Sequence, residues 1–160
     1  MPRIFLEMHI NAPVERVFDL SLSIDLHQLS ARQTNEKAIA GKTSGLIGLN
    51  ETVTWRARHF GIYQKLTVQI TKLERPFMFE DKMLKGAFAK MEHVHSFAKD
   101  GEGTRMTDEF VFESPMGIFG NMANVLFLEN YMRKFLITRN EEIKRIAESE
   151  EWKLILNSEL

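Results

Sequence analysis

The chain has 160 residues, of which 44% are hydrophobic and 27% are charged, and these values are ordinary for one globular domain with a sizeable core. Its 21 basic and 22 acidic side chains give a net charge of -1, so no positive field exists to neutralise a phosphate backbone, and we expect no nucleic-acid partner. The absence of cysteine excludes disulfides and thiolate chemistry. No apolar window reaches the roughly 18 residues of a membrane helix, so we expect a cytoplasmic protein without integral membrane association.

The beginning of the chain predicts a strand and a pair of short helices. Apolar and polar residues alternate in residues 3–10, which is the period-2 pattern of a half-buried strand. Asn11 is then a candidate helix cap, and Pro13 suits an early helical position. The apolar residues that follow recur at helical spacing up to Leu22 and predict a helix that breaks near residues 23–25.

The middle of the chain predicts antiparallel strands. Glycines punctuate a loop in residues 41–48, and two alternating runs then fill residues 49–73 with a turn at Gly61. Three further runs, separated by turn residues, are expected to continue as an antiparallel meander. These runs are residues 77–83, 88–97 and 104–112.

The last third predicts one long helix. Pro115 is expected to end the last strand, and apolar residues trace a single helical stripe through residues 122–146. Residues 139–145 mix both signs of charge, which is typical of an exposed helix surface. We therefore expect a helix with one buried face.

The order of these elements favours an α+β fold in which an antiparallel sheet wraps around a long C-terminal α-helix. Alternating strand and helix units, which would build a parallel sheet, are missing from the pattern. We assign residues 1–149 to one domain and residues 150–160 to a C-terminal tail. The apolar cluster at residues 152–156 either packs back on the domain or contacts a second copy, so a homodimer stays an alternative.

Polar residues on the inward faces of the strands are the candidate functional residues. Because side chains alternate across a strand, His93 and His95 both fall on the inward face of residues 88–97. Asp108 falls among apolar residues on the inward face of residues 104–112. A hairpin between these runs pairs residues whose numbers sum to about 201 to 203, which places Asp108 opposite His93 or His95.

Two further acids fall on inward faces. Asp81 lies in the run before Gly86, and pairing across this glycine places it near Met91 or His93. Glu51 shares the face of its run with a tryptophan.

A carboxylate beside an imidazole in an apolar interior forms a charged or strongly hydrogen-bonded pair, which can transfer protons or hold a polar group of a ligand. A second interpretation is an internal network that fixes strand register. Two histidines at positions i and i+2 can also share a metal ion, with Asp108 or Asp81 completing the set. That motif is unspecific, and we expect no metal or other cofactor.

Three stretches of the sequence are typical of a known superfamily. They are INAPVERVF at residues 10–18, FEDKMLKGAF at residues 79–88, and HVHSF at residues 93–97 followed by GTRMTD at residues 103–108. With the order of elements they resemble the START-like superfamily, also called SRPBCC, whose fold is the helix-grip, and they are similar to a bacterial branch described as polyketide cyclase-like. The resemblance covers roughly residues 3–148 and leaves the tail outside.

This resemblance implies a hydrophobic cavity between the sheet and the long helix, which members of the superfamily use for lipids, polyketides, plant hormones and other apolar molecules. Because fold alone does not transfer a reaction, we expect the binding of a hydrophobic small molecule such as a lipid, a polyketide or an aromatic metabolite. The alternative is a cyclase or dehydratase that uses a His/Asp pair in the same cavity. The expected ligand contacts are His93, His95, Asp81, Asp108, Glu51, Trp55, Phe79, Met106, Phe110 and Met132.

Overall fold

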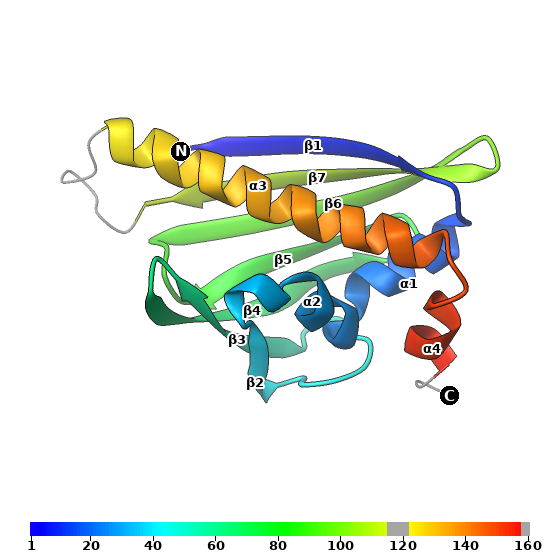
Figure 1. Cartoon of the computed structure of the whole chain (residues 1–160), viewed down its shortest axis with the longest axis horizontal. Coiled ribbons are helices and arrows are strands. Elements are labelled where there is room, and N and C mark those ends of the chain that lie inside the picture. The colour runs from blue at the N-terminus through cyan, green and yellow to red at the C-terminus, as the bar shows by residue number, and fades with distance from the viewer. Residues whose placement is uncertain (115–121, 158–160) are drawn as a thin grey trace.

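The computed structural model describes residues 1–114 and 122–157, which form an antiparallel sheet that curves around a long helix (Figure 1). The strands are β1 (Arg3–Ile10), β2 (Lys37–Gly41), β3 (Thr52–His59), β4 (Ile62–Glu74), β5 (Met78–Lys85), β6 (Lys90–Asp100) and β7 (Gly103–Glu113). The helices are α1 (Val14–Leu22), α2 (Ile24–Ser30), the short 3-10 helix η1 (Arg32–Thr34), α3 (Met122–Ala147) and α4 (Trp152–Leu156). The sheet order is β1-β7-β6-β5-β4-β3-β2, and the expected α+β architecture is confirmed.

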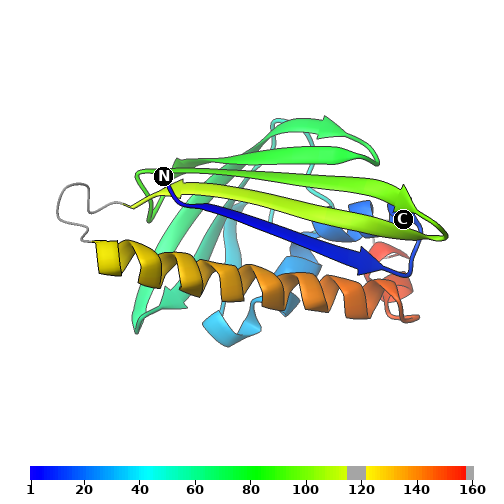
Figure 2. The same ribbon diagram turned by 90° about the horizontal axis from the view of Figure 1, so that it is seen from above.

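The long helix α3 crosses one side of the sheet beside β1, and α1 lies near the C-terminal end of α3 (Figures 1 and 2). Buried residues of these helices and of the strands form one hydrophobic core. Phe18 of α1, for example, sets its ring edge-on to the rings of Phe79 and Phe97, at centroid distances of 5.7 and 5.3 Å. Within the described ranges, none of the helices combines the length and the hydropathy that a membrane crossing requires.

The predicted break between the first two helices is confirmed and has a local cause. Ser23 adopts an extended backbone, with φ -72° and ψ 118°, which ends α1. Its hydroxyl oxygen then accepts a hydrogen bond from the backbone N–H of Leu26 at 3.1 Å, which caps the start of α2. One serine therefore ends one helix and begins the next.

The predicted strand registers are also confirmed at the candidate site. His95 lies opposite Asp108 in the β6–β7 hairpin, and Asp81 lies opposite His93 between β5 and β6. Hairpin geometry alone therefore brings the two histidines and the two acids to one place on the sheet.

The hydrophobic pattern does not predict β2. In this edge strand only Ala38 is half-buried, and its other four residues are exposed, so the strand carries no alternating signal and is recognised by its pairing with β3. Pro115, which was expected to end the last strand, lies outside the described residues.

The tail packs back on the domain. Trp152 and two other apolar residues of α4 contact the hydrophobic core, and the Arg16 guanidinium of α1 lies 4.1 Å from the centroid of the Trp152 ring. Leu154 remains 78% exposed. Of the two expectations for this cluster, packing on the domain is the one observed in the chain.

Replacing Gly41 with alanine is expected to lower the free energy of unfolding by about 2 kcal/mol or more. Gly41 has φ +72°, and a Cβ there would lie 2.3 Å from the backbone oxygen of Thr52 on β3. Gly61→Ala is the matched control, because Gly61 has φ +77° but no described atom within 4 Å of the added Cβ. Urea denaturation, monitored by circular dichroism, measures the free energy of unfolding of both variants. Equal losses of stability in the two variants would contradict the predicted clash.

Candidate functional site

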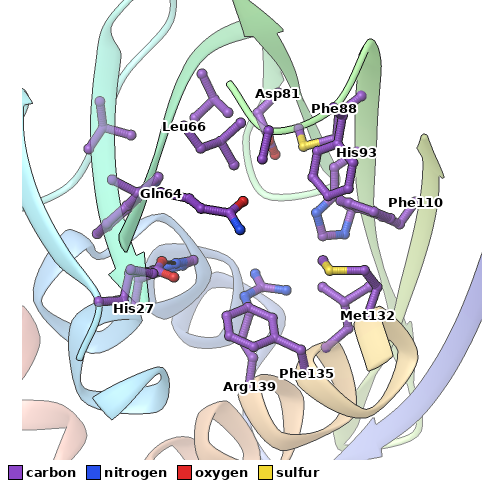
Figure 3. Close-up of a pocket in the computed structure, with 18 of the residues that line it drawn as sticks. His27, Gln64, Leu66, Asp81, Phe88, His93, Phe110, Met132, Phe135 and Arg139 are labelled. Carbon is purple, nitrogen blue, oxygen red and sulfur yellow. Dashed lines mark hydrogen bonds and ion pairs between the residues drawn. The ribbon is translucent and has the colours of Figure 1, made fainter. Parts of the chain in front are cut away.

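A cavity of about 530 Å³ opens between the sheet and α3 (Figure 3). Strands β3 to β7, the junction of α1 and α2, and α3 contribute side chains to its wall, which is predominantly apolar. The apolar wall includes Trp55, Val68, Phe79, Phe110, Met132 and Phe135.

Most of the predicted ligand contacts lie on this wall. The strands place both aromatic and polar members there because their inward positions alternate as expected. Those on the wall are Asp81, His93, His95, Trp55, Phe79, Phe110 and Met132.

Three predicted contacts do not line the cavity. Glu51 precedes β3, is exposed, and accepts a hydrogen bond from the backbone N–H of Gly48 at 2.6 Å. Met106 is 1% exposed and packs under α1, where its sulfur lies 3.9 Å from the hydroxyl oxygen of Ser21. Asp108 is fully buried and lies behind the histidines, so its influence on the cavity is indirect.

Asp108 is the centre of a buried polar cluster. His93 donates from Nε2 to Oδ1 of Asp108 at 2.8 Å, and Asn140 donates from Nδ2 to Oδ2 at 2.6 Å. Arg139 Nη1 lies 3.4 Å from Oδ1. Burial acts to raise the pKa of Asp108, but the hydrogen bonds from both imidazoles and the charge of Arg139 outweigh it and hold the pKa well below its usual value. Asp108 is therefore a carboxylate.

His95 lies between two carboxylates. Its Nε2 is 3.0 Å from Oδ2 of Asp81, and its Nδ1 is 2.9 Å from Oδ1 of Asp108. Nη2 of Arg139 lies 3.4 Å from the same Nδ1. The His95 ring is therefore enclosed by two carboxylates and the Arg139 guanidinium. Burial opposes ionisation of Asp81, but the hydrogen bond from His95 and the nearby positive charges lower its pKa overall.

Burial sets the protonation state of His93. Burial, together with the neighbouring His95 ring at a centroid distance of 3.7 Å, lowers the pKa of His93 to about 4, so its ring is neutral at pH 7. Because Nε2 donates to Asp108, the neutral ring carries its lone pair on Nδ1. The neutral His93 imidazole thus lies beside the His95 ring on the cavity wall.

Arg139 corrects one expectation. Residues 139–145 were predicted to be an exposed surface, but Arg139 is 5% exposed, lines the cavity and projects toward its centre (Figure 3). The signal was present in the spacing, because Arg139 follows the buried Leu136 by three residues and precedes the buried Ile143 by four. A basic residue at a position on the buried face of a helix therefore indicates a cation that points into the interior of the protein.

Sequence reasoning also missed a second polar group on the wall. Nε2 of His27 contacts Oε1 of the buried Glu36, and the His27 ring stacks on Trp55 at 4.1 Å. Farther along the wall, Nδ1 of His59 lies 2.7 Å from the Tyr131 hydroxyl, and burial lowers the pKa of His59. These residues come from α2, the segment before β2, the end of β3 and α3, so no single local pattern unites them.

Comparison with known proteins identifies the fold. Neither a protein-family model nor a curated protein sequence matches the chain. Among solved structures, TTHA0849 from Thermus thermophilus is similar with a TM-score of 0.74 at 20% identity, over 90% of this chain and 95% of that one. A START superfamily protein from Mycobacterium smegmatis has a TM-score of 0.68 at 13% identity, over 89% and 97%. The chain has the START-like fold.

A plant protein shares the same architecture. The major latex-like protein 151 of Panax ginseng matches with a TM-score of 0.65 at 12% identity, over 91% of this chain and 97% of that chain. The START-like fold thus accounts for the helix-grip arrangement of the sheet around α3. At these identities the likeness concerns the fold, and the chemistry has to be argued from the side chains of this chain.

Acid is expected to destabilise the protein, beginning near pH 6.5. His93 takes up its proton at a pKa of about 4 when folded and near 6.5 when unfolded. The unfolded state therefore binds more protons between these values, and stability present above pH 6.5 is lost as the pH falls toward 4. For one such group the loss between pH 7 and pH 5 is about 2 kcal/mol.

The variant His93→Gln should flatten this part of the pH profile, because it removes the titrating ring. Urea denaturation in metal-free buffer at pH 7 and pH 5 measures the difference, and a variant profile parallel to the wild-type profile would contradict the assignment. The charged or titratable groups that surround the ring stay in place in the variant. They are His95 on β6, Asp81 on β5, Asp108 on β7 and Arg139 on α3.

Proposed function

We propose that the protein binds a hydrophobic small molecule, such as a lipid, a polyketide or an aromatic metabolite, in the cavity between the sheet and α3. The observation that carries this proposal is an apolar cavity of about 530 Å³ with charged groups gathered on one part of its wall. That volume lies within the roughly 300–1,000 Å³ of small-molecule sites, and such sites combine apolar lining with a few convergent polar groups.

The charges of the polar cluster support a proposal for the chemical group at the polar end of this molecule. Asp81 and Asp108 are ionised, so their charges at least offset that of Arg139, and the cluster has no excess positive charge without a ligand. An uncharged oxygen, in a hydroxyl or a carbonyl group, leaves that balance intact and can accept a hydrogen bond from the guanidinium. We therefore propose an apolar body with a hydroxyl or carbonyl end near Arg139.

Monoolein, oleate and the tricyclic aromatic emodin test this proposal as a neutral lipid, an acidic lipid and an aromatic polyketide. At least one of them should raise the thermal midpoint and saturate in calorimetric titration, because a ligand that binds only the folded state stabilises it. Monoolein should bind more tightly than oleate, since a carboxylate adds an unbalanced charge. Three flat titrations would contradict the proposal.

Filling the cavity provides a sharper prediction. Leu128 lines the cavity and is half-buried, whereas Leu126 on the same helix is 54% exposed and does not line it. Leu128→Trp should weaken binding of the best probe at least about tenfold by occupying space, while Leu126→Trp should leave it unchanged. Calorimetric titration measures both variants, and equal affinities would place the ligand elsewhere.

A cyclase or dehydratase is the second candidate function, and the His93–Asp108 pair favours it. The carboxylate holds His93 through Nε2 at 2.8 Å, so the ring borders the cavity in a fixed orientation. Such a ring can act as a general base, and the neighbouring His95–Asp81 pair can act as the acid.

This second candidate predicts that His93→Gln abolishes turnover but spares binding. The substrate to test is a linear poly-β-keto thioester of N-acetylcysteamine, with product formation followed by mass spectrometry. Wild-type turnover that survives in the variant would contradict a catalytic His93. A variant that binds the best probe within about threefold of wild type would separate the loss of chemistry from the loss of the site.

A further inference from the structure

Three side chains on the cavity wall hold ligand atoms of the kind that bind metal ions. Asp81, His93 and His95 each offer one such atom, and these atoms lie within 4.8 Å of one another. Nε2 of His95 and Oδ2 of Asp81 are already 3.0 Å apart. Two donors on one tetrahedral ion are about 3.4 Å apart when each bond is about 2.1 Å, so the spacing of this pair is close to what one ion requires.

The carboxylate behind these residues provides the second observation. Asp108 contacts Nε2 of His93 at 2.8 Å and Nδ1 of His95 at 2.9 Å. Each imidazole therefore has one nitrogen held by the same buried carboxylate and its other nitrogen available to the site formed with Asp81. Histidines that bind metal ions usually have the second ring nitrogen fixed by a carboxylate, a backbone carbonyl or a water, which orients the ring and makes it a stronger donor.

The charges also allow a cation despite the nearby Arg139. With both imidazoles neutral, Asp81 and Asp108 outweigh the single guanidinium by one negative charge. A divalent ion bound to this arrangement leaves the cluster with one net positive charge. Coordination positions that the three side chains leave open face the cavity, because all three residues line it.

We propose that Asp81, His93 and His95 bind a divalent first-row transition ion, such as Zn²⁺ or Fe²⁺, with Asp108 as the residue that positions both imidazoles. Two histidines and one carboxylate suit these ions and leave coordination positions for water or an oxygen of a small molecule. The inference concerns the polar cluster of the proposed ligand site, but it holds whether or not a hydrophobic molecule binds there.

Titration of chelator-treated full-length protein with Co²⁺ and then Zn²⁺ tests the site without any organic ligand. Co²⁺ should develop visible d–d absorption that saturates at about one ion per chain, and Zn²⁺ should displace it. Asp81→Asn and His93→Gln should each weaken Zn²⁺ binding at least about 100-fold, and Asp108→Asn should weaken it about 10- to 100-fold and shift the Co²⁺ spectrum.

His9→Gln is the matched control, because His9 is an exposed histidine beside Asp100 that lies outside the cavity, and its loss should change nothing. Circular dichroism checks that each variant folds, and Asp81→Asn carries the test if a more deeply buried substitution unfolds the chain. Absence of a saturable Co²⁺ spectrum overturns the proposal. Unchanged affinity in Asp81→Asn also overturns it. Either result would leave the binding of a hydrophobic molecule to be judged by its own titrations.

Discussion

The Asp108 carboxylate is the interaction on which the rest of the site depends. It is fully buried and contacts His93 and His95 of β6 and Arg139 and Asn140 of α3. A buried carboxylate is costly unless its oxygens are satisfied, so this one ties the long helix to the middle of the sheet at a defined position. It also sets the orientation of both imidazole rings.

The same attachment explains why the cavity lies along the N-terminal part of α3. Beyond the polar cluster, α3 packs tightly through Ile143 and Ile146, which are 2% and 1% exposed. Before the cluster, Leu128 and Met132 are only half-buried and face the cavity. The helix therefore meets the sheet closely at its C-terminal end and stands away from it toward its N-terminal end. The cavity occupies the space that remains.

The polar groups divide the cavity wall into regions with different chemistry. One region combines the two imidazoles of His93 and His95, the Asp81 carboxylate and the Arg139 guanidinium, and Asp108 contacts both imidazoles and the guanidinium. The other contains His27, Glu36 and the His59–Tyr131 pair. Apolar side chains cover most of the rest of the wall, and Gln64 and Lys65 of β4 lie among them. This distribution supports a small molecule with a mostly apolar body, and the first region is also the place where a metal ion fits.

Local patterns in the sequence determined the described strands other than β2, the paired helices and the placement of Asp108 opposite His93 or His95. Side-chain alternation and hairpin register depend on neighbouring residues alone. They could not determine that Asp108 is covered by the histidines and α3 and does not line the cavity, while Arg139 does. Those positions depend on how α3 lies across the sheet, which joins residues 31 apart in the chain. The cavity likewise follows from the tilt of a helix against a curved sheet, and only the tertiary structure decides that geometry.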